Sequence, residues 1–159
     1  MSARGWTDSE LDAMAWHIGY EVRMLTGQVV ALEHRRVRSP REQAWIEASL
    51  VHLRLLDEFL AKSAGSRKYA TRAALWGWSG GGFLTRRERG RVNAKVAHLA
   101  IDRLIQLDWQ PQELRPVAVR CCERILEFVE HVERTDPTRG AAFATAKAHA
   151  TGFVAAARR

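Results

Sequence analysis

The 159-residue chain lacks the features that mark several large classes of protein. No apolar run approaches the roughly 18–20 residues that span a bilayer, so the sequence predicts no membrane segment. The N-terminal residues lead into no apolar stretch, and we therefore expect no secretory signal. P-loop, Rossmann, GxSxG and paired-cysteine zinc motifs are all missing, so neither a metal nor a cofactor is predicted.

Cysteine is scarce, and its placement indicates a reducing compartment. The two cysteines, Cys121 and Cys122, are neighbours in the chain. A disulfide between adjacent residues is strained and rare, and there is no other cysteine to pair with either. We therefore predict two free thiols in a cytoplasmic protein.

Lysine is also scarce, whereas arginine is abundant. The chain has 21 Arg and 4 Lys against 18 acidic residues, which gives a formal net charge of +7. Such a balance favours an acidic partner, and nucleic acid is the first candidate. The arginines are spread along the chain, so an Arg-rich composition without a nucleic-acid role stays open.

Three capping boxes predict where helices begin. In each, a Ser or Thr is followed three positions later by Glu, so that hydroxyl and carboxylate satisfy each other's backbone amides. The three boxes are Thr7–Glu10, Ser39–Glu42 and Thr85–Glu88. After each box, apolar residues recur in the steps of three and four that are typical of a helix with one buried face.

These signals predict an all-α fold, an antiparallel four-helix bundle. The expected helices span residues 7–32, 39–62, 85–107, and a stretch from between Pro111 and Pro116 to about Glu133. Residues 63–84 form a long loop between helices 2 and 3 that contains Trp76 and Trp78. We divide the chain into a bundle, 1–137, and an Ala-rich C-terminal part, 138–159, that forms a short fifth helix or a tail.

Several polar residues fall on apolar helix faces, where they need partners. His52 lies at the centre of the apolar stripe of the second helix. We interpret it as a core histidine held by hydrogen bonds, with a ligand or catalytic group in the bundle interior as the alternative. Asn93 and Arg103 fall on the apolar side of the third helix, where we expect each to meet a carboxylate or a backbone carbonyl of another helix; Glu21 and Asp57 are the candidate carboxylates.

The other face of the third helix carries the residues best suited to chemistry. Arg91 and His98 are seven positions apart, so they lie two turns apart on one face, with Lys95 between them. Asp102 lies one turn beyond His98, where it can orient the imidazole. A solvated face with i,i+4 ion pairs would show the same pattern.

The segment from Arg91 to His98 resembles the Arg–x4–6–His motif of the HEPN superfamily, which lies on a late helix of a four- to five-helix bundle. Residues 52–60 are similar to a helix-two signature of HEPN-like bacterial proteins of unassigned function, and residues 93–99 resemble its companion. The resemblance covers about residues 7–133. Active members carry a polar residue directly after the motif Arg, whereas Val92 stands here; a non-catalytic relative that uses Asn93 and His98 therefore stays open.

The resemblance implies metal-independent RNA cleavage, in which the 2′-hydroxyl attacks the adjacent phosphate. His98 would act as general acid or base, and Arg91 would stabilise the phosphate charge. It also implies a homodimer with two facing motifs, a defence or toxin–antitoxin setting, and an antitoxin-like partner protein. Lys95 would contact RNA, and Trp76 and Trp78 would stack on unpaired bases unless they pack back over the end of the bundle.

Two other functions stay open. One is a non-catalytic bundle that acts through oligomerisation or partner binding, with structural roles for its polar residues. The other is a metal-dependent bundle enzyme, because His17, His52 and His98 fall one on each of three helices. The absence of HxxxH and ExxH pairs argues against the metal enzyme.

Overall fold

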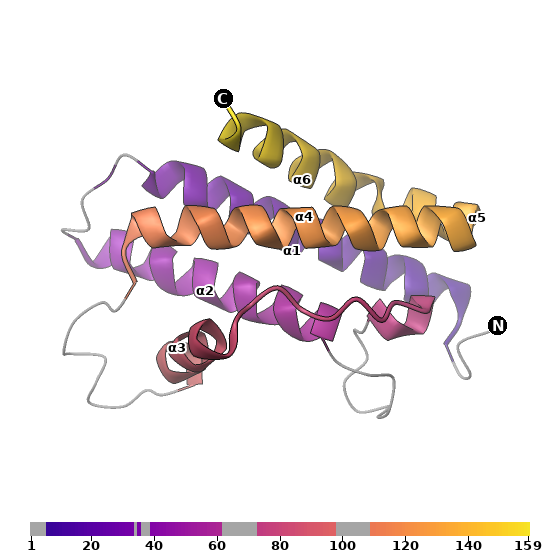
Figure 1. Ribbon diagram of the computed structural model, residues 1–159, viewed down its shortest axis with the longest axis horizontal. Coiled ribbons are helices and arrows are strands. Elements are labelled where there is room, and N and C mark those ends of the chain that lie inside the picture. The colour runs from indigo at the N-terminus through magenta and orange to yellow at the C-terminus, as the bar shows by residue number, and fades with distance from the viewer. Residues whose placement is uncertain (1–5, 34, 36–38, 62–72, 98–108) are drawn as a thin grey trace.

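The computed structural model describes residues 6–33, 35, 39–61, 73–97 and 109–159, and all regular structure in these ranges is helical (Figure 1). The predicted all-α class is confirmed. Five helices are long: α1 (Asp8–Leu32), α2 (Pro40–Ala61), α3 (Arg86–Ala97), α4 (Pro111–Thr135) and α6 (Ala144–Ala157). The short elements are η1 (Ala73–Trp76), α5 (Pro137–Gly140) and η3 (Ala141–Phe143).

The three predicted capping boxes are all present. At the start of α1 the Thr7 amide donates to Glu10 at 2.7 Å, and the Glu10 amide donates back to the Thr7 hydroxyl at 3.3 Å. The Ser39–Glu42 and Thr85–Glu88 pairs make the same reciprocal contacts at the starts of α2 and α3. Local hydrogen bonding at a few residues thus determines where these helices begin.

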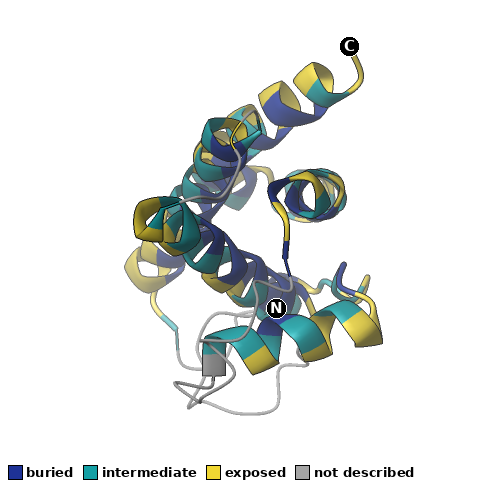
Figure 2. Cartoon of the chain, turned by 90° about the vertical axis from the view of Figure 1, so that its left-hand side faces the viewer, coloured by how far each residue is buried: buried dark blue, intermediate teal, exposed yellow. Residues whose placement is uncertain are grey.

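Four helices run along the long axis of the molecule: α1, α2, α4 and α6 (Figure 1). α1 and α2 run in opposite directions, and so do α4 and α6. α1 packs against α2, α4 and α6 and is therefore the central helix of the bundle. The buried residues of these helices face a shared interior (Figure 2).

The C-terminal part, where the sequence left a helix or a tail open, forms α5 and α6. α6 packs against both α1 and α4 and buries Ala146, Ala150, Phe153 and Val154. Its alanines allow a close approach: a Cβ added at Gly19 of α1 would lie 3.1 Å from the Cβ of Thr145. A helix that packs through alanines has only a weak apolar periodicity, and for this reason the sequence did not decide between a helix and a tail.

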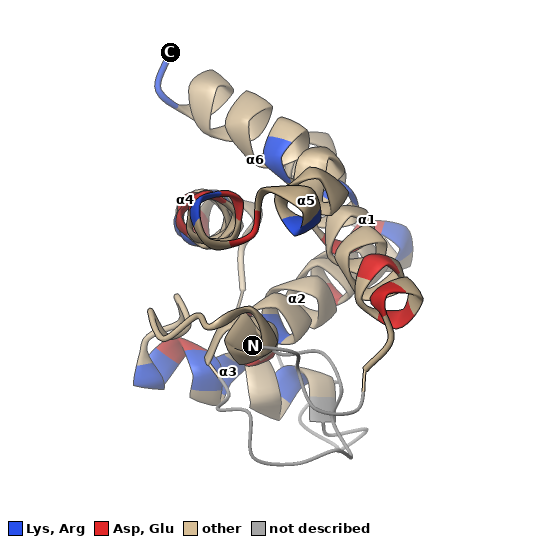
Figure 3. Cartoon of the chain, turned by 90° about the vertical axis from the view of Figure 1, so that its right-hand side faces the viewer, with Lys and Arg blue, Asp and Glu red and all other residues tan. Residues whose placement is uncertain are grey.

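The third predicted helix takes a different place from the one expected. α3 lies crosswise on the outer side of α2 and packs mainly against that helix (Figures 1 and 3). Among its described side chains only Val92 is fully buried. The helix is rich in arginine and has too few apolar residues to fill a bundle position, and α6 lies in the core instead.

An aromatic cluster closes one end of the bundle. Phe59 of α2 and Phe128 of α4 meet edge to face at 5.2 Å between centroids, and Phe143 lies 5.0 Å from Phe128. Trp76 of η1 packs on all three rings. The chain then continues as a strap, residues 77–85, which leads to α3.

Candidate functional site

The basic helix α3 is anchored by a buried carboxylate on α2. Oδ1 of Asp57 accepts hydrogen bonds from the backbone amides of Phe83 and Leu84, both at 2.9 Å. Oδ2 accepts from Nε of Arg89 at 2.8 Å, and this hydrogen bond raises the pKa of Arg89. One side chain therefore fixes both the end of the strap and the first turns of α3.

A second ion pair fixes the start of α3 to α4. The carboxylate of Glu88 caps the helix and also accepts from Arg120 at 2.5 Å. Burial acts to raise the pKa of Glu88, but the hydrogen bonds from Thr85 and Arg120 outweigh it and lower the pKa below the ordinary value. The helix is thus held against both α2 and α4.

The side chain of Arg91, the first residue of the predicted catalytic motif, extends from α3 to the start of α4. Its guanidinium is 4.3 Å from the centroid of the buried Trp109 ring and forms an ion pair with Glu113 at 3.1 Å. The second guanidinium nitrogen lies 3.5 Å from the other Glu113 oxygen, which gives a forked arrangement. Only 26% of the Arg91 side chain is exposed, so part of its hydrogen-bonding capacity is used within the fold.

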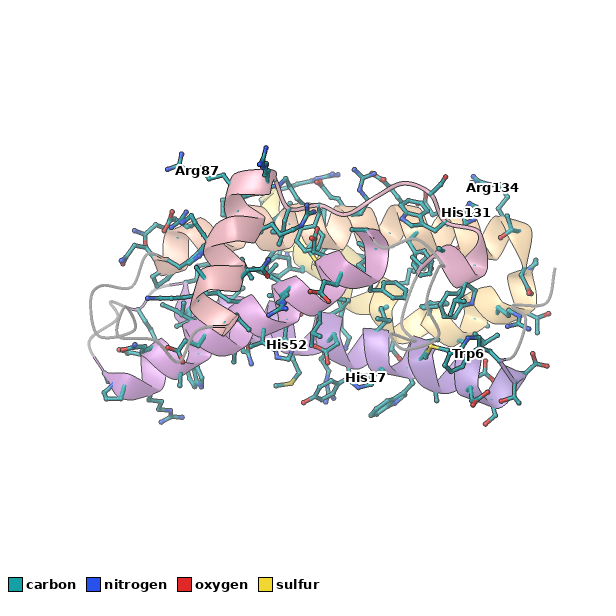
Figure 4. The ribbon with its side chains drawn as sticks, turned by 90° about the horizontal axis from the view of Figure 1, so that it is seen from below. Trp6, His17, His52, Arg87, His131 and Arg134 are labelled. Carbon is teal, nitrogen blue, oxygen red and sulfur yellow. The ribbon has the colours of Figure 1, made fainter. Side chains whose placement is uncertain are left out.

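Positive charge is concentrated on α3. Its twelve residues include five basic side chains and one acidic one, a net charge of +4 against +7 for the whole chain. Arg86 and Arg87 are exposed in its first turn; Figure 3 shows the basic residues of α3 in blue, and Figure 4 labels Arg87. The charges of Arg86 and Arg87 face outward, whereas Arg89 and Arg91 are paired with Asp57 and Glu113.

The remaining predicted site residues divide into two groups. His98, Asp102 and Arg103 lie outside the described residues. Asn93 and Lys95 are both half-buried on α3. The carboxylates expected to meet Asn93 or Arg103 hold other groups: Asp57 binds Arg89, and Glu21 binds His52.

The tryptophans predicted to stack on RNA pack on the bundle, as the alternative interpretation held. Trp76 is buried in the aromatic cluster, and its carbonyl lies 3.0 Å from Nε2 of His131. The Trp78 ring packs edge to face on Phe128 at 5.9 Å and on His131 at 5.8 Å. These contacts leave no open face of Trp76 for a base.

A second polar site lies between α1 and α2, where His52 was predicted to be a satisfied core residue. We call Glu21, Gln28, Ser49 and His52 the polar seam. Nδ1 of His52 lies 2.5 Å from Oε2 of Glu21, and the two side chains are 12% and 8% exposed. His52 is therefore paired with a carboxylate, which the sequence did not anticipate.

The hydrogen bonds of the polar seam have a consistent direction. A carboxylate only accepts, so Nδ1 of His52 donates to Glu21, and Nε2 is left to accept from the Gln28 amide at 3.5 Å. Oε1 of Gln28 accepts from the Ser49 hydroxyl at 3.1 Å. This arrangement orients an imidazole as a catalytic carboxylate–histidine pair does, but Gln28 occupies the nitrogen that would act on a substrate.

The outer edge of the polar seam is His17, whose Nδ1 lies 3.5 Å from Oε1 of Glu21 and whose side chain is 60% exposed. Two histidines thus flank one carboxylate (Figure 4). Within the described ranges, no group of three or more His, Cys, Asp or Glu side chains could hold a metal ion. His17 and His52 each contact a different oxygen of Glu21.

Two residues important to these sites, Trp109 and Glu113, were given no such role by the sequence analysis, and a third, Asp57, was expected to meet a polar residue of the third helix other than Arg89. Asp57 anchors α3, and Trp109 and Glu113 receive Arg91. The position of Glu113, three residues after Gln110 at the start of α4, is a capping signal, and its carboxylate does accept from the Gln110 amide at 2.8 Å. The contact with Arg91 has no local signal, because it joins residues 22 positions apart.

No helix in the part of the chain that the structure describes is both long and apolar enough to cross a membrane. No family model, curated protein or solved structure matches the chain.

Proposed function

We propose that this chain is a HEPN-like helical bundle that binds RNA through α3 and cleaves it without a metal ion. The supporting observation is the concentration of charge on α3, with a net +4 on twelve residues that lie outside the core. A rigid helix with exposed arginines suits the phosphate backbone, because each phosphate contact releases condensed counterions. The anchors at Asp57 and Glu88 hold these charges in place before RNA binds.

The proposed reaction uses the motif residues of α3 and the segment after it. A base, His98 of one subunit, takes the proton of the 2′-hydroxyl, whose oxygen attacks the adjacent phosphorus. The bond to the 5′-oxygen breaks, and a second histidine, supplied by the other subunit of a homodimer, protonates the leaving oxygen. The products are a 2′,3′-cyclic phosphate and a 5′-hydroxyl. Arg91 stabilises the charge on the phosphate oxygens.

The cleavage test is incubation of total RNA with the protein in EDTA. We expect cleavage by the wild type, loss of cleavage in His98→Ala, and a 2′,3′-cyclic phosphate at the new ends. RNA that stays intact with the wild type, at protein concentrations that saturate binding, would refute catalysis. Sedimentation of the same samples tests the homodimer.

The binding test is fluorescence anisotropy with a labelled single-stranded RNA at several salt concentrations. We expect Arg86→Gln/Arg87→Gln to weaken binding, and to reduce the slope of log K against log salt by about 0.7 for each lost phosphate contact. Arg134→Gln is the matched control for the single change Arg87→Gln, because Arg134 is also exposed but lies at the other end of the molecule (Figure 4). Equal effects of the two changes would contradict a binding role for α3.

The alternative function, a non-catalytic bundle that acts by binding a protein partner or a second copy, is favoured by the environment of Arg91. Its guanidinium is held by Glu113 and Trp109. If that role is structural, Arg91→Ala should lower stability by about 1–3 kcal/mol, the effect of losing a cation–π contact and an ion pair that is only partly buried. A catalytic role predicts instead that RNA cleavage falls by much more than the folded fraction does.

A further inference from the structure

An exposed aromatic cluster on α1 has no role in the sites described above. All six tryptophans lie in the described part of the chain, and Trp16 is the one whose side chain is exposed, at 67%. The other five pack wholly or partly against the core. Single exposed apolar residues are common at protein surfaces, but Trp16 stacks on Tyr20, and the pair presents an exposed aromatic surface suited to contact with another molecule.

Four residues form this α1 aromatic cluster: Trp16, His17, Tyr20 and Arg23. The rings of Trp16 and Tyr20, one helical turn apart, are nearly parallel, with 19° between their planes and 6.1 Å between their centroids. His17 meets the Tyr20 ring edge-on at 6.0 Å. The guanidinium of Arg23 lies over the same ring, 5.9 Å from its centroid. The Trp16–Tyr20 pair is thus an ordered surface supported by its neighbours.

The charged groups around the cluster differ between its two ends, and only the end at Arg23 favours an anionic group. Arg23 supplies a fixed positive charge at one end, and His17 lies beside the rings. Glu21 is turned into the polar seam, where His52 and His17 contact both of its oxygens. Asp12, which is exposed, lies one turn before Trp16, at the opposite end from Arg23.

We propose that the α1 aromatic cluster is a stacking platform for a base of single-stranded RNA. The exposed face of Trp16 takes the base, because every base has a π-face that an aromatic ring can cover without reading its sequence. Arg23 contacts the phosphate on the side of Tyr20. The cluster supplies the stacking expected from Trp76 and Trp78, which pack on the bundle instead.

This inference rests on the proposed RNA-binding function and extends it to a second helix. α2 packs against both α1 and α3, and it lies between them in Figure 3. A single strand that contacts the phosphate-binding arginines of α3 could therefore continue across α2 to α1. The platform would add affinity for unpaired bases that α3 alone does not provide.

The test compares Trp16→Ala and Trp16→Phe, with Val30→Ala as the control, in binding to a labelled single-stranded RNA. Val30 is another exposed apolar residue of α1, outside the cluster. We expect Trp16→Ala to raise Kd by about fivefold to a hundredfold, the range for loss of one stacked base. Trp16→Phe should keep most of the affinity, and Val30→Ala should bind as the wild type does.

Two further readouts separate stacking from a general effect on the fold. An RNA with abasic sites should bind the wild type more weakly than the intact RNA, and this difference should shrink in Trp16→Ala. The salt slope should stay unchanged in Trp16→Ala, because no phosphate contact is lost, and should fall by about 0.7 in Arg23→Gln.

The outcomes distinguish this inference from the proposed function. If RNA binding depends on Arg86 and Arg87 but not on Trp16, the platform is refuted and RNA binding by α3 stands. If Trp16→Ala changes the sedimentation of the protein and leaves RNA affinity unaltered, the cluster is a protein interface, which also refutes the platform. If the wild type binds no RNA, the proposed function fails and the platform with it.

Discussion

Glu21 and His52 join α1 to α2 through a contact of 2.5 Å between Oε2 and Nδ1, in a part of the bundle where both side chains are largely buried. Because both side chains are largely buried, water cannot replace the hydrogen bond between them as it could at the surface. Removing His52 would leave a buried carboxylate without its partner, which costs about 3–5 kcal/mol, whereas removing Glu21 would leave an imidazole N–H without its acceptor, which costs about 1–3 kcal/mol. Removing one partner should therefore lower stability by more than the intact pair contributes to it.

We expect Glu21→Ala to lower the free energy of unfolding by about 1–3 kcal/mol, because the Nδ1–H group of His52 loses its acceptor. The double variant Glu21→Ala/His52→Ala should cost less than the sum of the two single changes, since it leaves neither group unpaired. Urea denaturation of the four proteins measures this coupling. His17→Ala is the control: its exposed ring contacts the same carboxylate, and its loss should cost less than about 1 kcal/mol. An equal cost for Glu21→Ala and His17→Ala would contradict a buried pair.

Asp57 should be the residue on which the placement of α3 depends most. Asp57→Asn keeps an oxygen for the strap amides but loses the charge that holds Arg89, so we expect a loss of about 2–4 kcal/mol. The amides of Phe83 and Leu84 should exchange with solvent faster than in the wild type, because a neutral amide oxygen accepts more weakly than a carboxylate does. Glu58→Gln is the matched control, because Glu58 is the next residue and its ion pair with Arg54 is partly exposed. Unchanged exchange at residues 83 and 84 in Asp57→Asn would rule out the anchor.

Two glycines of α1 should respond differently to the same substitution. A Cβ at Gly27 would meet no atom within 4 Å, so Gly27→Ala should stabilise the protein by about 0.5–1 kcal/mol through helix propensity. A Cβ at Gly19 would lie 3.1 Å from Cβ of Thr145, so Gly19→Ala should stabilise it less or destabilise it. Thermal unfolding of both variants measures the difference. A larger gain for Gly19→Ala than for Gly27→Ala would show that α1 and α6 do not approach closely here.

The sequence predicted the parts of this fold that depend on neighbouring residues. Capping boxes at Thr7, Ser39 and Thr85 need only four consecutive residues, and all three helix starts are where they were expected. His52 was predicted to be a core histidine from its position on the apolar stripe of one helix, and it is largely buried. Periodicity within a helix carries this information without any knowledge of how helices pack.

The sequence could not predict which helices would share the core. α6 lies beside α1 and α4 because alanines and Gly19 permit close packing, and small residues produce little periodic signal. Likewise, the partners of Asp57 and Arg91 lie 22 to 32 residues away. Such contacts depend on the arrangement of α3 across α2. The sequence predicted that α3 has a charged face, but it did not predict where α3 packs.

The adjacent thiols of Cys121 and Cys122 give a prediction about reactivity. Both side chains are fully buried in α4. Burial raises the pKa of Cys121 well above its ordinary value, and burial together with Glu123 raises the pKa of Cys122 to about 12. The thiolate is the reactive form, so neither cysteine should react with a thiol reagent at pH 8 in the native protein. Both should react once the protein is unfolded in urea. Fast labelling of the folded protein would mean that α4 opens readily.

The same shifts make stability depend on alkaline pH. A cysteine in the unfolded chain has a pKa near 8.5. Below about pH 8 the thiols keep their protons in both the folded and the unfolded protein, so their ionisation does not change the free energy of unfolding. Between about pH 8.5 and 12 the unfolded chain loses protons that the folded protein retains, and the free energy of unfolding falls as pH rises. The limiting slope is about 1.4 kcal/mol per pH unit for each thiol.

Urea denaturation at pH 7 and pH 10 tests this for the wild type and for Cys121→Ala/Cys122→Ala. The double variant should be less stable at pH 7, because each change removes a buried sulfur and leaves a small cavity. Its further loss between pH 7 and pH 10 should be smaller than that of the wild type, by about 2 kcal/mol for each thiol removed. Other groups that ionise in this range contribute equally to both proteins, so the difference belongs to the two cysteines. An identical loss in the two proteins would mean that water reaches the thiols in the folded state.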